Sequence, residues 1–281
     1  MGEPRVEGLP GLRFSLAGPG RVGASLARWA VASGAALVSV AGRSGGPPAW
    51  EGGPPRTGLE ALETAGQDLL LIAVPDGALP AVAATLARRP QARVALHTSG
   101  SRDASVLAPL RTAGAAVGSL HPLKAFPHPL PDPAEGRGVF FAVDGDPEAQ
   151  DLAHRLATSW GAVSAPVPPE ARTLYHFAAT LAAGGVTTLL AAAAEIAGKL
   201  GLPPEVAQGY VELARGAVTA AGDALGTGLP LASAITGPAA RGDRATLLQH
   251  LEALRHVSPD KLPLALFAML ETLRQTDADG V

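Results

Sequence analysis

The segment LRFSLAGPGRVG, from Leu12 to Gly23, determines how the rest of this chain is interpreted. Its first half is a short apolar run around Phe14 and Leu16, typical of a buried strand. Residues 18–23 match the pattern G-x-G-x-x-G, and residues 21–33 then carry apolar side chains at helical spacing. A strand, a glycine turn and a helix in this order predict a phosphate-binding turn, because free backbone N–H groups at the helix N-terminus face the ligand.

Glycine is abundant in this chain, at 34 of 281 residues, so the pattern carries weight only through its position at the end of the first predicted strand. The alternative is a purely structural turn between strand and helix. We expect a dinucleotide at this turn. Its phosphates would contact Gly18, Pro19, Gly20, Arg21, Val22 and Gly23.

The next predicted strand, Ala36 to Ala41, indicates which dinucleotide. An NAD site favours an acidic residue there for the ribose 2′-hydroxyl, but no Asp or Glu occurs between Ala24 and Trp50. Arg43 and Ser44 stand there instead, and a guanidinium can pair with a 2′-phosphate. Arg43 could also be a solvated loop charge. We predict NADP as the cofactor.

Composition excludes several classes of protein. The net charge is −3 and no basic run is interleaved with aromatic residues, so we expect no nucleic-acid partner. The chain has no cysteine, which excludes disulfides and thiolate chemistry, and no His and carboxylate residues have metal-ligand spacing. The first 13 residues lack the pattern of a secretory signal. We expect a cytoplasmic protein without a metal.

Short apolar runs alternate with helical segments through the first half, which predicts an α/β fold with a mostly parallel, Rossmann-like sheet over residues 1–165. Residues 166–281 lack strand patterns and predict an all-α domain of four helices. We expect those helices over residues 170–200, 204–224, 243–255 and 261–275.

The stretch Phe177 to Ala194 has no charged residue and approaches the length of a membrane span. Alanine, glycine and threonine dominate it, which favours a closely packed soluble helix and no membrane association. Because the predicted helix 170–200 is too apolar to lie exposed on a monomer, we expect a homodimer through the helical domain.

Candidate site residues follow the predicted strands, where open α/β sheets bind their ligands. We assign Ala73, Val74, Pro75, Thr98 and Ser99 to the cofactor.

His121 follows a strand and could exchange a proton with the substrate, as could His176 at the start of the helical domain. Either histidine could instead be structural. Lys124 is one of three lysines and is a candidate substrate contact, with a solvated loop lysine as the alternative.

The turn at residues 234–243 contains Gly237-Pro238 and separates two predicted helices. Asp243 is expected to cap the helix that follows. Thr236 and Arg241 are candidate substrate contacts, and Arg241 could hold an anionic group bidentately or simply pair with Asp243. We expect these residues to face His121 across the bound nicotinamide.

Six motifs resemble a two-domain family that joins a Rossmann-like domain to a domain of unknown function, DUF2520. They are GPGRVG (18–23), AVPD (73–76), HTSG (97–100), HPLKAF (121–126), YHFAA (175–179) and ITGPAARGD (235–243). The layout is also similar to pyrroline-5-carboxylate reductase, coenzyme-F420-dependent NADP oxidoreductase and prephenate dehydrogenase. Two positions depart from the family pattern: Gly184-Gly185 stands where an asparagine is expected, and Lys124 replaces an uncharged amide.

The resemblance implies an NADP-dependent oxidoreductase, which we expect to act on a small carbonyl or imine compound in a cleft between the two domains. A different class of function would be a nucleotide-binding sensor or scaffold that performs no turnover.

Overall fold

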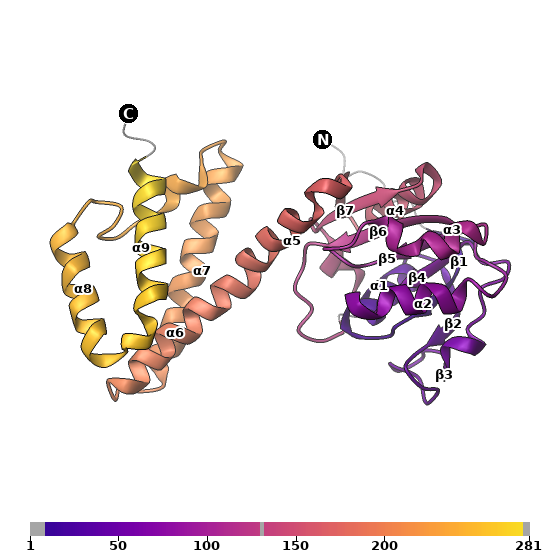
Figure 1. The fold of residues 1–281 in the computed structure, drawn as a ribbon, viewed down its shortest axis with the longest axis horizontal. Helices are drawn as coiled ribbons and strands as arrows, with labels where there is room; N and C mark the ends of the chain where they lie inside the picture. The colour runs from indigo at the N-terminus through magenta and orange to yellow at the C-terminus, as the bar shows by residue number, and fades with distance from the viewer. Residues whose placement is uncertain (1–8, 130–131, 278–281) are drawn as a thin grey trace. The chain divides into compact units, whose positions relative to one another are not determined.

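The computed structural model describes residues 9–129 and 132–277 of the chain. Most of the N-terminal stretch used for the cytoplasmic expectation therefore lies outside the described residues. Contacts divide the chain into two compact units, Met1–Thr180 and Leu181–Val281, and Figure 1 shows each as a ribbon.

The first unit is built on one sheet with the strand order β3-β2-β1-β4-β5-β6-β7-β8. Neighbouring strands are parallel except for β6 and β7, which are antiparallel. The first six positions follow the doubly wound order of dinucleotide-binding folds. The predicted α/β class is confirmed. The strands are β1 Arg13–Ala17, β2 Ala36–Ala41, β3 Arg56–Thr57, β4 Leu69–Ile72, β5 Val94–His97, β6 Ala116–Pro122, β7 Phe140–Gly145 and β8 Val163–Pro166.

Helices cover both faces of this sheet. Helices α1 (Arg21–Ala32) and α4 (Pro147–Ser159) pack on one face, and α2 (Leu79–Leu86) and α3 (Ala108–Thr112) pack on the other. Strand β4 shows why both faces are covered: Leu69 and Leu71 belong to one apolar cluster, while Leu70 and Ile72 belong to the other. Because side chains alternate along a strand, its unbroken apolar run predicts burial on both faces.

Short 3-10 segments connect these elements. The segments in the first unit are η1 Leu59–Ala61, η2 Asp76–Ala78, η3 Ala104–Leu107, η4 Pro133–Gly136 and η5 Pro169–Ala171.

Two strands were not predicted. Strand β3 has two residues, and β8 is a partly exposed edge strand that contains Pro166. Neither carries a local apolar signal. The predicted boundary after residue 165 follows the change from strand to helix, whereas the compact unit extends to Thr180. The reason is that α5 (Arg172–Thr180) buries Arg172 against the sheet.

The second unit is helical, as predicted. Its helices are α6 Val186–Lys199, α7 Glu205–Gly226, α8 Arg244–Val257 and α9 Leu262–Asp277, with 3-10 turns η7 Leu231–Ala234 and η8 Pro259–Lys261. The helix expected over residues 170–200 contains a π-helical segment, η6 (Leu181–Gly185), that includes both glycines of the Gly184-Gly185 departure.

Few side chains of helices α6 to α9 are buried. Among the described residues of this unit only Ala192, Ala197, Ala224, Leu247 and Ser258 are fully buried. Large apolar side chains on all four helices are exposed, including Leu213 (73%), Leu248 (67%) and Phe267 (65%). A domain of this size ordinarily forms a continuous apolar core, and this unit has none of its own.

In the described part of the chain, one helical stretch, Pro169–Lys199, has the length and composition to cross a membrane, and an 18-residue window within it has a mean hydropathy of 1.7. A core or interface helix of a soluble protein passes the same test, and this stretch begins with the buried charge of Arg172.

His97 ends β5 and is fully buried. Its Nδ1 accepts from the Ser99 backbone N–H at 3.2 Å, and its Nε2 lies 3.1 Å from the Asp103 carbonyl, to which it can donate. Burial lowers the pKa of His97 to about 4. The histidine is therefore a neutral structural brace for the loop after β5.

We expect the free energy of unfolding to fall as the pH drops from 6.5 to 4. The unfolded chain binds a proton at His97 near pH 6.5, whereas the folded chain resists until about pH 4, so stability present at neutral pH is lost in this window. The loss attributable to His97 is about 3 kcal/mol. Urea unfolding at pH 7, 5.5 and 4.5 measures it. In His97→Gln the slope with pH should be shallower, and an unchanged slope would contradict the assignment.

Candidate functional site

The predicted glycine turn connects β1 to α1. Gly18 has a φ of +93°, and a Cβ there would overlap the carbonyl of Ala73. A Cβ at Gly23 would overlap the carbonyl of Gly18 and lie 2.9 Å from the Cβ of Ala73. Both glycines are therefore required for close packing between the turn, the helix and the end of β4.

Gly20 differs from these two, because a Cβ there would meet nothing within 4 Å. Its side of the turn is open. The first turn of α1 has no side-chain cap and no acidic residue. An open glycine beside uncapped N–H groups and a positive helix end fits a phosphate group. The side chain of Arg21 is directed elsewhere, since its Nη1 donates to the Pro127 carbonyl at 3.4 Å.

The loop after β2 presents Arg43 and Ser44, and both are exposed. A second arginine, Arg56 of β3, lies against the same loop: its Nε donates to the Pro47 carbonyl at 2.8 Å, and a Cβ at Gly46 would lie 2.8 Å from its Nη2. Within the described residues, neither guanidinium has a carboxylate within 4 Å. Two uncompensated positive charges favour an anion here. Sequence reasoning missed Arg56, because it lies outside the acid-free stretch that drew attention to Arg43.

The residues expected after β4 and β5 lie in different surroundings. Ala73 forms the floor of the glycine turn, as described above, and the Thr98 backbone N–H donates to Ile72 at 3.1 Å. Ser99 is buried, and its hydroxyl accepts from the Arg102 backbone N–H at 3.1 Å. The Ser99 hydroxyl thus stabilises the conformation of the loop after β5.

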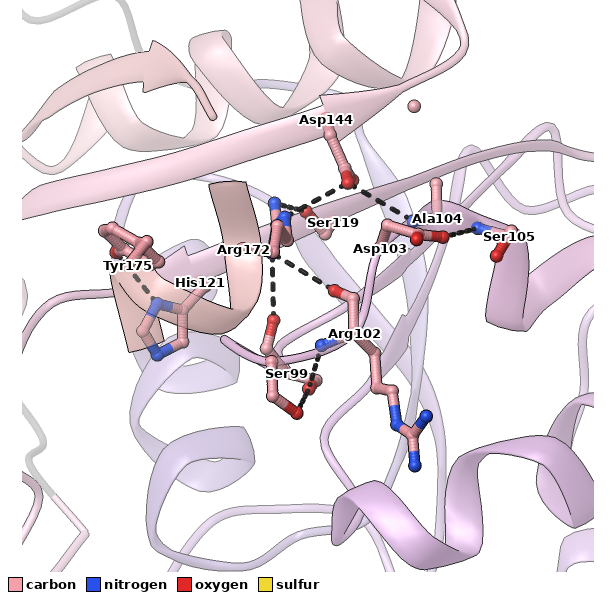
Figure 2. A network of polar contacts seen from close by, with 12 residues as sticks. Ser99, Arg102, Asp103, Ala104, Ser105, Ser119, His121, Asp144, Arg172 and Tyr175 are labelled. Atoms are coloured by element: carbon pink, nitrogen blue, oxygen red, sulfur yellow. Dashed lines mark hydrogen bonds and ion pairs between the residues drawn. The ribbon is translucent and has the colours of Figure 1, made fainter. Parts of the chain in front are cut away.

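A buried arginine organises the polar network in Figure 2. Arg172 of α5 is 1% exposed, and its Nε lies 3.1 Å from Oδ2 of Asp144 at the end of β7. Its Nη1 donates to the carbonyls of Ser99 at 3.1 Å and Arg102 at 3.2 Å, and its Nη2 donates to the Ser119 hydroxyl. Burial lowers the pKa of Arg172, and Asp144 opposes this. One side chain thereby joins α5 to β5, β6 and β7.

One helical turn further along α5, two side chains reach His121 of β6. The Tyr175 hydroxyl lies 3.0 Å from His121 Nδ1, as Figure 2 shows. The His176 and His121 rings are edge to face with centroids 5.7 Å apart. Burial lowers the pKa of His121 to about 4, with His176 and Arg172 acting in the same direction. Burial also raises the pKa of Tyr175, so its hydroxyl stays protonated.

A carboxylate adjoins this cluster. Asp76 of η2 accepts a hydrogen bond from the Ser101 hydroxyl at 2.6 Å. Burial acts to raise the pKa of Asp76, but hydrogen bonds from Ser101 and Ser99 and the nearby His176 lower it below its usual value. Asp76 is therefore charged at neutral pH. The two predicted histidines are brought together here, and Tyr175, Asp76 and Ser101 complete a cluster that we did not predict.

The predicted substrate contacts belong to other segments of the chain. Lys124 forms an ion pair with Glu135 at 3.4 Å, in the loop after β6. Thr236 and Arg241 belong to the second unit, in the turn before α8. Asp243 caps α8 as expected, because its side chain accepts from the Thr246 backbone N–H at 3.1 Å. No group of three histidine or carboxylate side chains suited to a metal occurs within residues 9–129 and 132–277.

We expect Arg172→Leu to lower the free energy of unfolding by about 3 to 5 kcal/mol, because it leaves the Asp144 carboxylate buried without its cation. Denaturant unfolding followed by circular dichroism measures this. Arg155→Ala is the matched control: Arg155 forms an exposed i,i+4 pair with Asp151, and its loss should cost about 0.5 kcal/mol. Similar effects of the two variants would contradict the role of Arg172.

Both parts of the chain match known domain families. The sequence matches a Rossmann-like domain over residues 9–122 and the domain of unknown function DUF2520 over residues 139–269. None of the curated proteins matches it.

Several solved structures share the fold. A Bacteroides fragilis protein designated an NADP oxidoreductase superposes with a TM-score of 0.73 at 20% identity, covering 96% of this chain and 99% of that one. A Thermotoga maritima protein gives 0.69 at 18% identity, with coverage of 95% and 100%. Plasmodium falciparum pyrroline carboxylate reductase with NADP bound gives 0.62 at 15% identity, covering 96% and 100%. At these identities the likeness establishes the fold. The chain therefore joins a Rossmann-like domain to a DUF2520 domain, the two-domain family that its motifs resemble.

Proposed function

We propose that this protein is an NADP-dependent oxidoreductase that acts on a small carbonyl or imine compound. The observation that carries the proposal is the open turn at Gly20, where an uncapped helix N-terminus faces free space at the end of β1. Arg43 and Arg56 supply two positive charges, and neither has a carboxylate within 4 Å among the described residues, which favours a 2′-phosphate. Two structural neighbours, one designated an NADP oxidoreductase and the other a reductase with NADP bound, agree with this proposal.

When bound, a nicotinamide supplies or accepts the hydride, so this chain needs to contribute orientation and a proton. His121 and His176 are the side chains we assign to the proton. Tyr175 holds His121 by its Nδ1, which leaves Nε2 available to a substrate. The expectation that Thr236 and Arg241 also contact the substrate stays a prediction, as does the one for Lys124.

A sensor or scaffold without turnover would need the glycine turn alone. Such a protein has no need of two adjacent histidine rings with unpaired nitrogens, whereas His121 Nε2 and the buried His176 Nδ1 lack hydrogen-bond partners among the described residues, as substrate-binding groups do. This observation favours the enzyme.

We expect Arg43→Ala to weaken NADPH binding by about 1.5 to 3 kcal/mol, the value of a charge-assisted contact, and to leave NADH binding nearly unchanged. Fluorescence or calorimetric titration with each cofactor measures this. Arg88→Ala, at an exposed arginine just after α2, is the control and should affect neither cofactor. An equal loss for NADPH and NADH would contradict the 2′-phosphate assignment.

We also propose that the helical unit is completed by a second copy of itself. Its exposed apolar residues alternate along α6 to α9 with ion pairs such as Lys261–Glu195 and Arg215–Glu212. Stripes of this kind pack against other helices, whereas a membrane span needs an uncharged circumference. A closed two-fold dimer covers the same stripes on both copies. Solubility and a cytoplasmic location, which stay predictions, accord with such a dimer.

Sedimentation velocity at micromolar concentration should show a particle of two chains. Leu213→Glu should shift the particle to one chain, because Leu213 is a large exposed apolar residue of α7. Leu123→Glu, at an exposed leucine of the first unit, is the control and should leave the dimer intact. A monomer for the unaltered protein would contradict the proposal.

A further inference from the structure

Gly100 lies directly beneath both histidines of the site. A Cβ on this residue would be 2.6 Å from His121 Nε2 and 2.5 Å from His176 Nδ1. Real side chains do not tolerate such distances, so any other residue at position 100 would displace at least one ring. Because glycine has no side chain, the two ring nitrogens approach each other over the Gly100 backbone.

The hydrogen bonds of the two rings are incomplete on this side. His121 Nδ1 pairs with the Tyr175 hydroxyl, whereas its Nε2 makes no hydrogen bond within the described part of the chain. His176 Nδ1 is buried and also lacks a partner there. A buried polar atom without a partner costs about 1 to 3 kcal/mol, so a native structure ordinarily supplies one.

We propose that His121 and His176 bind one and the same substrate atom, in the position over Gly100. That atom is the oxygen of a carbonyl or hydroxyl group, or the nitrogen of an imine or amine, on the carbon that exchanges the hydride. This assignment rests on the proposed oxidoreductase function. It adds that the two rings work as a pair and that Gly100 determines which groups fit.

The protonation state of the two histidines depends on the polar and charged groups around them. Asp76, His97, Arg172 and Tyr175 surround the two rings. Burial and the nearby His176 lower the pKa of His121 to about 4, so His121 is neutral at neutral pH.

In the direction of reduction, the substrate carbon gains a hydride and the π electrons move to its oxygen or nitrogen. That atom takes one proton from the pair, and water restores it. In oxidation the same atom gives its proton to the pair as the hydride leaves.

Histidine NMR tests the pairing without a known substrate. In protein labelled with ¹⁵N-histidine, the ring resonances of His121 and His176 are followed from pH 4 to 8. In His176→Gln, the pKa of His121 should rise, because His176 acts to lower it. An unmoved His121 pKa would overturn the pairing.

Isopropanol serves as a probe for the shared position, since its hydroxyl can donate to one ring and accept from the other. Titration should shift the nitrogen resonances of both rings together, with the same apparent affinity. In Gly100→Ala this joint response should be lost. Gly77→Ala is the matched control, because a Cβ at Gly77 meets nothing within 4 Å. A response from one ring alone, or a joint response that survives in Gly100→Ala, would overturn the proposal.

Cofactor titration separates this inference from the proposed function. Gly100→Ala and His176→Gln should bind NADPH as the unaltered protein does, because neither residue belongs to the glycine turn. If the unaltered protein binds no NADPH while the rings are coupled, the oxidoreductase assignment fails and the paired site stands. If NADPH binds and the rings titrate independently, the pairing fails alone.

Discussion

The ion pair between Arg172 and Asp144 is the contact on which the arrangement of the site depends. Removing two charges from water is expensive, and part of this cost is offset because Arg172 also donates to two carbonyls and a hydroxyl. A hydrophobic contact in this position could slide along α5 or rotate about it. A guanidinium with four fixed acceptors cannot, so it sets both the height and the rotation of the helix over the sheet. Tyr175 and His176 follow within one turn, and their positions over His121 are consequences of where Arg172 is held.

Glycine residues also determine the site, because they allow neighbouring groups to pack closely against the backbone. At Gly18 and Gly23 it brings the turn against the end of β4, and at Gly100 it brings two rings over one backbone position. In the first case the packed groups are backbone, so the fold requires the glycine. In the second they are imidazoles, which could rotate away in a folded protein. A requirement for glycine at position 100 therefore belongs to the chemistry of the site, whereas the requirement at 18 and 23 belongs to the fold.

The extent to which the sequence predicted this molecule depended on how local each signal is. Strands β1, β2, β4 and β5 are short and mainly apolar, and the glycine turn lies between a strand and a helix, so their recognition needed only neighbouring residues. Strand β8 and the two residues of β3 are held by pairing with distant partners and have no such signal. The same limit applies to the site. His121 and His176 were identified as separate candidates from residue type and position, but nothing local shows that α5 returns across the sheet to bring them together.

Arg172 is the most instructive omission. An arginine at the start of a helix in a polar stretch of sequence suggests a solvated residue, because arginines are seldom buried. Its burial follows only from Asp144, a single acid that ends the apolar run of β7, and from the Ser119 hydroxyl on the neighbouring strand. Each of these is unremarkable alone, since an acid after a strand is ordinarily a turn residue. Taken together, an acid and a hydroxyl at paired positions of adjacent strands form a buried polar site. Its charge and its hydrogen bonds are matched by a long cationic side chain. Sequence reasoning could have found Arg172 by searching for such a cation among the residues that follow the last strand.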